Sequence, residues 1–194
     1  MDMRISVAIP YYKFPGSGQL LSRCLNSIAS QTFKDYEIVV TDEGKMAENT
    51  NASIRQSKGE LVKILYMDDY LAHPNALKDI ADNFKGEWLV TGYTHTNLDQ
   101  HNIPFYNDQI HTGKNTIGSP SVLTIKNGLD IYFDENLTWV LDCDFYRRLH
   151  DRYGDPTILD DINVVIGTHP EQASYKIPET IKQWEYKYAK EKKY

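Results

Sequence analysis

Apolar runs and amphipathic segments alternate from the beginning of this chain to about residue 92. The apolar runs are rich in β-branched residues and are followed by Pro, Asp or Gly, which is typical of buried strands. The segments between them repeat apolar residues at helical spacing. This alternation predicts βαβ units with right-handed crossovers, so we expect an α/β fold with a mostly parallel central sheet flanked by helices. The expected strands are residues 5–9, 37–41, 61–65 and 87–92, and the expected helices are residues 20–31, 52–58 and 75–84.

The second half of the chain is less regular. Residues 93–118 are polar, and we expect them to form loops. Further expected elements are short strands at 121–125, 131–133 and 164–166, and a helix at 142–152. A charged helix is expected at 178–194. Its apolar stripe, which we interpret as packing against the domain with a dimer contact as the alternative, is Ile177, Ile181, Trp184 and Tyr188.

The composition excludes several classes of protein. Proteins that bind nucleic acid through its phosphates usually carry a basic face, whereas this chain has a net charge of −6. We therefore expect no nucleic-acid partner. No apolar run approaches the roughly 18 residues of a membrane-spanning helix, and no signal peptide is evident. The two cysteines, Cys24 and Cys143, fit neither a disulfide framework nor a zinc site, so we interpret them as reduced thiols in a cytoplasmic protein.

Two acidic clusters are the main candidate functional residues. Asp68 and Asp69 follow the expected strand at 61–65, and Asp142 begins the later helix. A carboxylate pair where a buried strand meets solvent is a natural site for a hard divalent cation, which leaves positions open for substrate phosphates. Ligands of open α/β sheets bind at the carboxyl ends of the strands. Four side chains that follow strand ends are therefore expected on one edge: Tyr12, Asp42, Asp68 and Asp69.

Four motifs, in the right order, resemble those of family 2 glycosyltransferases of the GT-A fold. The first is the strand at 5–12, Ile-Ser-Val-Ala-Ile-Pro-Tyr-Tyr, and the second is the segment at 27–40 around Gln-Thr-Phe. The third, at 51–60, precedes the acidic pair, and the fourth, at 142–149, begins Asp-Cys-Asp-Phe. The resemblance is dense over residues 4–90 and returns around the fourth motif.

The resemblance implies the inverting transfer of a sugar from a nucleotide sugar, with a UDP-sugar as the expected donor, to a hydroxyl acceptor on a glycan or related molecule. It also implies Mn²⁺ or Mg²⁺ as the cofactor. The tyrosine would stack on the base, and the aspartate after the second strand would accept a hydrogen bond from uracil. The implied nucleotide-binding residues are Pro10, Tyr12, Asp42 and Asp68, the implied metal ligands are Asp69 and His169, and the implied general base is Asp142.

In terms of domains, the resemblance implies a single catalytic domain over 1–194. Residues 1–92 would form its nucleotide-binding half, residues 93–176 its acceptor half, and residues 177–194 its C-terminal helix.

Most of these residues also have a purely structural interpretation. Asp68 and Asp69 would cap the helix that follows them, and Asp142 would cap its own helix. Tyr12 would be a core aromatic and Asp42 a turn residue. His169 would likewise be an ordinary loop histidine, and the segment at 118–121 would be a simple turn rather than a border of the acceptor pocket.

Two positions depart from the family's pattern. The metal motif often begins with Asp, where this chain has Tyr66, and the catalytic motif often has Glu before its Asp, where this chain has Leu141. Each change removes one carboxylate, so a catalytically degenerate module that binds nucleotide or glycan is an alternative. A nucleotidyltransferase is a second alternative, although the loop at 12–18 contains only one Lys for a triphosphate. The Gln-x-x-Arg-Trp motif of processive synthases is absent, so a membrane-coupled synthase is not expected.

Overall fold

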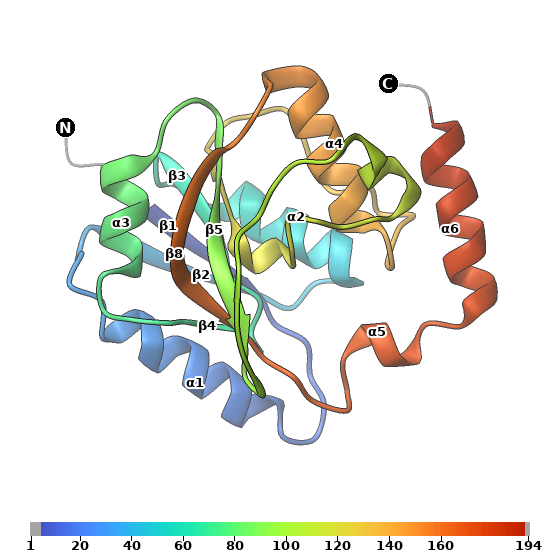
Figure 1. The fold of residues 1–194 in the computed structure, drawn as a ribbon. Coiled ribbons are helices and arrows are strands. Elements are labelled where there is room, and N and C mark those ends of the chain that lie inside the picture. The colour runs from blue at the N-terminus through green and yellow to red at the C-terminus, as the bar shows by residue number, and fades with distance from the viewer. Residues whose placement is uncertain (1–4, 193–194) are drawn as a thin grey trace.

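The computed structural model describes residues 5–192, and its first half has the expected alternation of strands and helices (Figure 1). The strands are β1 (Ile5–Pro10), β2 (Tyr36–Thr41), β3 (Leu61–Ile64), β4 (Tyr70–Leu71), β5 (Trp88–His95), β6 (Leu98–Asn102), β7 (Leu123–Lys126) and β8 (Thr157–Ile166). The helices are α1 (Ser17–Ala29), α2 (Met46–Gln56), α3 (Ala76–Asn83), α4 (Leu141–Tyr153), α5 (Ala173–Lys176) and α6 (Glu179–Glu191), with 3₁₀ turns η1 (Asp108–Thr112) and η2 (Pro120–Val122).

The strands form one mixed sheet in the order β2-β1-β3-β7-β5-β8-β4, with β6 paired to β5. β1 runs parallel to β2 and β3, and β5 runs parallel to β8. β7 is antiparallel to both β3 and β5, and β4 and β6 are antiparallel to their neighbours. The α/β class is therefore confirmed, while the sheet is mixed rather than strictly parallel because β7 enters between β3 and β5.

A buried lysine marks the junction of β3 and β7. Lys63 lies opposite Thr124 in the sheet, and its ammonium donates hydrogen bonds to the carbonyls of Ile64, Ser121 and Leu123. Burial lowers the pKa of Lys63 to about 7. The side chain thus joins β3 to the segment that leads into β7.

Helices cover both faces of the sheet and create two hydrophobic cores (Figure 1). Alternate residues of a strand point to opposite faces. In β1, Ile5, Val7 and Ile9 therefore pack with residues of α1 and α3, whereas Ala8 packs with residues of α2 and α4. Helix α6, red in Figure 1, lies beside α4 and contributes Ala189 to the second core.

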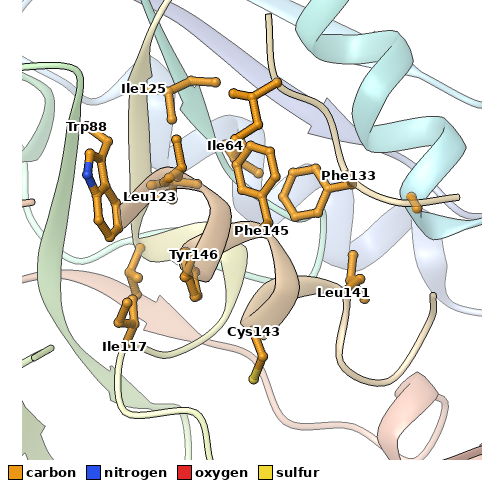
Figure 2. Close-up of a cluster of buried hydrophobic side chains, with 14 of the residues drawn as sticks. Ile64, Trp88, Ile117, Leu123, Ile125, Phe133, Leu141, Cys143, Phe145 and Tyr146 are labelled. Atoms are coloured by element: carbon orange, nitrogen blue, oxygen red, sulfur yellow. The ribbon is translucent and has the colours of Figure 1, made fainter. Parts of the chain in front are cut away.

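Aromatic side chains fix helix α4 against the sheet (Figure 2). The ring of Phe145 stacks on Phe133 with centroids 4.0 Å apart, and the ring of Tyr146 stacks on Trp88 at 6.3 Å. The indole of Trp88 also donates a hydrogen bond to the carbonyl of Gly154, 3.0 Å away, just beyond the helix. The middle and the C-terminal end of α4 are therefore held by buried contacts.

The structure differs from the sequence prediction in several respects, among them the start of β8 at Thr157 instead of residue 164. The polar stretch 93–118 is not all loop, because β5 continues to His95 and pairs with β6. The expected strand at 131–133 does not form, since the side chain of Asn51 takes up both the amide and the carbonyl of Phe133 at 2.8 and 2.9 Å. Helix α2 begins at Met46 instead of residue 52. The sequence prediction missed its first turns because they are polar and show no apolar periodicity.

The apolar stripe predicted for the C-terminal helix does not pack as expected. Ile181 and Trp184 are 43% and 50% exposed, whereas Glu185 and Ala189 are the buried residues of α6. The predicted packing of this stripe is therefore wrong at its centre. The helix is attached by Ala189, Tyr186 and Tyr188, which pack against the core, and by the polar contacts described below. None of the helices within residues 5–192 is long and apolar enough to cross a membrane.

Truncation of Phe145 tests the role of the aromatic stack. Replacing this fully buried ring by Ala should lower the free energy of unfolding by about 3–5 kcal/mol, because the change removes buried area and leaves a cavity. Urea denaturation measures this effect. Tyr175→Ala, at an exposed position, is the matched control and should change the stability by less than about 0.5 kcal/mol. Equal effects of the two substitutions would contradict the role of the Phe145 ring in holding α4 against the sheet.

Candidate active site

Two adjoining cavities open at the carboxyl ends of the strands. The acidic pocket, of about 330 Å³, is lined by Asp68, Asp69 and Asp142 among other residues. The aromatic pocket, of about 460 Å³, is lined by Tyr12 and Phe14 among others. The residues common to both walls, which make the cavities continuous, are Met46, Tyr66, Asp68, Thr138, Gln172 and Ile177.

Asp69 is buried at the floor of the acidic pocket. Its carboxylate accepts a hydrogen bond from the amide of Gly167 at 2.7 Å and one from the hydroxyl of Ser119 at 3.3 Å. Burial raises the pKa of Asp69 well above its usual value, the charge of Asp68 raises it further, and hydrogen bonds from Ser121, Gly167 and Ser119 oppose the shift. A cation would offset this cost, because an opposite charge favours the ionised carboxylate.

His169 lies beside the acidic pair, just beyond the end of β8. Its Nε2 is 2.9 Å from a carboxylate oxygen of Asp68, and its ring stacks on Phe14 with centroids 5.4 Å apart. Its Nδ1 is buried and has no hydrogen-bond partner among the described residues. The structure thus brings together the acidic pair and the histidine that the sequence placed about 100 residues away.

These side chains fit a cation that arrives with a phosphate-bearing substrate. Among the side chains that the structure describes, no group of three or more His, Cys, Asp or Glu residues is placed so that it could hold a metal ion. Magnesium-like ions are usually held by one or two carboxylates together with substrate phosphates. Asp69 provides a carboxylate for such a site, and His169 lies beside the acidic pair.

Tyr12 and Pro10 line the aromatic pocket together with His169. Tyr12 is 66% exposed, and its amide donates to the sulfur of Met67 at 3.4 Å. The alternative that Tyr12 is a core residue is therefore wrong, and its ring is open to a ligand. Asp42 follows β2 at the same sheet edge and is exposed, but it is not among the described residues that line either cavity.

Asp142 stands in the first turn of α4 and lines the acidic pocket with Asp69. One carboxylate oxygen accepts a hydrogen bond from the side chain of Asn115, and the other accepts one from the amide of Cys143, both at 2.7 Å. Burial raises the pKa of Asp142 to about 6, and the hydrogen bonds from Cys143 and Asn115 oppose the shift. A carboxylate with a raised pKa in a cleft is suited to accept a proton near neutral pH.

The two departures from the family pattern have different surroundings. Tyr66 lines both pockets, receives a hydrogen bond from Thr50 at 3.3 Å, and has a pKa raised by burial, so it remains a neutral phenol. Leu141 is the first residue of α4; it is buried in the core and also lines the acidic pocket. Asp144, in the first turn of α4, is buried and pairs with Arg148 at 2.8 Å.

Sequence reasoning missed Asn115 and Gly167 at the site. Asn115 stands in the polar stretch that was expected to be loop, and no motif marks it. Ser119 and Ser121 belong to the segment that had been noted as a candidate border of the acceptor pocket, and Ser119 does line the acidic pocket. The amide of Gly167 completes the environment of Asp69.

The sequence at residues 6–108 matches the family model described as glycosyl transferase family 2. This match covers more than half of the 194 residues, so the chain belongs to that family. No curated protein sequence is a significant match.

Solved glycosyltransferase structures share the fold. S. aureus TarS 1–349 in complex with UDP-GlcNAc superimposes with a TM-score of 0.71 at 21% identity, over 91% of this chain and 62% of that chain. The same protein in complex with UDP gives 0.67 at 22% identity, over 87% and 62%. The mannosyltransferase PcManGT from Pyrobaculum calidifontis, in complex with GDP-Man and Mn²⁺, gives 0.59 at 16% identity, over 90% and 59%. The chain therefore spans less than two thirds of each of these proteins. The expected family, GT-A fold and transferase class are confirmed.

Gly167 permits the close approach of β8 to the acidic pair. A β-carbon at this position would lie 2.0 Å from the backbone oxygen of Asp68, so Gly167→Ala must displace the turn. We expect a loss of about 1–3 kcal/mol of stability, which is usual for overpacking, measured by chemical denaturation. Gly18→Ala is the matched control, because a β-carbon there meets no atom within 4 Å. The assignment is rejected if the two variants are equally stable.

Proposed function

We propose that the chain is an inverting, metal-assisted glycosyltransferase domain that uses a nucleotide sugar, with a UDP-sugar as the first candidate. The observation that carries the proposal is that Asp69 and Asp142 line one cavity, which continues into the pocket of Tyr12. This arrangement provides adjacent places for a nucleotide, a diphosphate and an acceptor. The family membership and the shared fold support it, and two neighbours of the same fold are complexes with UDP-GlcNAc and GDP-Man.

In this proposal the nucleotide occupies the aromatic pocket. The exposed ring of Tyr12 stacks on the base beside Pro10, and Asp68 accepts a hydrogen bond from the ribose. Asp42 lies at the neighbouring strand end, and its carboxylate accepts a hydrogen bond from the edge of the base that extends beyond the pocket. Asp69 and His169 would hold the divalent cation, which would supply positive charge beside the leaving diphosphate.

The sugar and the acceptor meet in the acidic pocket. Asp142 takes the proton of the acceptor hydroxyl while its oxygen bonds to the anomeric carbon and the bond to the diphosphate breaks. One displacement of this kind inverts the anomeric configuration. Asn115 orients the carboxylate of Asp142. Its side-chain amide donates a hydrogen bond to one carboxylate oxygen, while the other oxygen accepts one from the backbone amide of Cys143 in the first turn of α4.

The proposal is tested by a panel of nucleotide sugars. Thermal shift with and without Mn²⁺ identifies the nucleotide, since a ligand at 100 times its dissociation constant stabilises by about 2.7 kcal/mol. Release of nucleoside diphosphate in the presence of saccharide acceptors then measures transfer. Binding without any release would favour the degenerate binding module, for which the loss of carboxylates at Tyr66 and Leu141 is the supporting observation.

Asp142→Asn should retain donor binding and lower the transfer rate by roughly 10²–10⁴-fold, because a positioned base is removed. The variant should remain folded. Since burial raises the pKa of Asp142 above its ordinary value of 3.8, ionisation destabilises the folded state as pH rises, and an uncharged Asn should leave the melting temperature at pH 7 equal or higher. Asp151→Asn, on the exposed side of the same helix, is the control. Normal turnover by Asp142→Asn would refute the base assignment.

The pH dependence of transfer provides an independent check. A base acts in its deprotonated form, so kcat/KM should rise with pH and level off above the pKa of Asp142, which is about 6. Steady-state rates between pH 4.5 and 8 measure this acidic limb. A rate that does not change across pH 6 would count against Asp142 as the titrating group.

A further inference from the structure

The carboxylate of Glu185, on α6, is buried against the loop that leads into α4. It accepts hydrogen bonds from three consecutive backbone amides: Thr138 at 3.0 Å, Trp139 at 2.7 Å and Val140 at 3.1 Å. Only 1% of the residue is exposed. Successive backbone N–H groups that converge on one point form an anion-binding nest, and in this protein the anion is a side chain of the chain itself.

A buried carboxylate is costly unless hydrogen bonds compensate for its lost hydration. Here the compensation comes from the backbone amides of one short loop, so these hydrogen bonds fix the position of the loop relative to the carboxylate of Glu185. The rest of α6 strengthens this attachment. The indole of Trp139 donates to the hydroxyl of Tyr186 at 2.7 Å, and the ammonium of Lys192 lies 3.3 Å from the carboxylate of Asp144.

The nest is directly connected to the candidate base. Thr138, Trp139, Val140 and Asp142 all line the acidic pocket. Val140 is the N-cap of α4, and its carbonyl accepts the first hydrogen bond of that helix, from Asp144 at 3.0 Å. The side chain of Val140 makes no capping hydrogen bond to the helix. The position of the first turn, and of the Asp142 carboxylate in it, therefore depends on the loop that Glu185 holds from behind.

We propose that Glu185 is a positioning residue, which fixes the direction of the Asp142 carboxylate and makes the C-terminal helix part of the transfer apparatus. This inference rests on the proposed role of Asp142. It assigns α6 a function in turnover, in addition to the contribution of Ile181 to the wall of the aromatic pocket.

The test compares Glu185→Ala and Glu185→Gln with Glu191→Gln, an exposed glutamate of the same helix. Three quantities are measured: amide hydrogen exchange, donor affinity and kcat. Glu185→Ala should accelerate exchange at Thr138, Trp139 and Val140 and lower kcat by about 10²-fold, which is the usual effect of a small displacement of a reacting group. Donor affinity should stay within about twofold. Glu185→Gln retains one acceptor oxygen and should be intermediate, and Glu191→Gln should match the wild type.

Two results would overturn the inference. The first is faster exchange at the three amides with an unchanged kcat. The second is an equal fall of kcat and donor affinity with exchange accelerated throughout the protein, which indicates a merely structural role. If the wild type transfers no sugar from any donor, the proposed function fails instead. The inference is then decided by ¹³C NMR titration of the Asp142 carboxyl, whose raised pKa should fall toward 3.8 in Glu185→Ala as the turn opens to water, and an unchanged pKa would reject it.

Discussion

A hydrogen bond between two segments far apart in the sequence organises the site. The amide of Gly167, at the end of β8, donates to the carboxylate of Asp69, beyond the end of β3, over 2.7 Å. The absence of a side chain at Gly167 permits this approach, and the hydroxyl of Ser119 reaches the same carboxylate from a third segment. Because a buried carboxylate requires such donors, the three segments cannot be arranged independently. The position of Asp68 and Asp69 thus depends on the whole sheet.

Much of this arrangement follows from local sequence. Runs of β-branched residues defined the strands of the first half, and the rule that ligands bind at strand ends placed Tyr12, Asp68 and Asp69 at one edge. The structure adds that Tyr12 is exposed beside the aromatic pocket, while Asp42 remains at the edge without lining it. Asp142 was singled out because it belongs to an acidic cluster and because its motif resembles that of family 2 glycosyltransferases.

The rest depends on contacts that no local pattern records. Asn115 reaches Asp142 from a polar stretch without periodicity, and Glu185 binds backbone amides, which have no sequence signature of their own. The apolar stripe of the last helix was misleading for a related reason. The most buried residue of this helix is Glu185, whose carboxylate accepts hydrogen bonds from loop amides, whereas Trp184 is half exposed. Apolar periodicity predicts which face of a helix packs on a hydrophobic core. It does not predict hydrogen bonds to backbone groups that are distant in the sequence.

The insertion of β7 between β3 and β5 has a consequence for synthesis of the chain. When β1, β2 and β3 have left the ribosome, β3 is paired on one side only, and its open edge waits until residues 123–126 emerge. Open strand edges invite pairing with other chains, and a charged residue within the strand discourages it. Lys63 stands in the middle of β3, and in the finished sheet its ammonium donates to carbonyls of the segment that arrives later. The same side chain thus protects a nascent edge and then helps to close it.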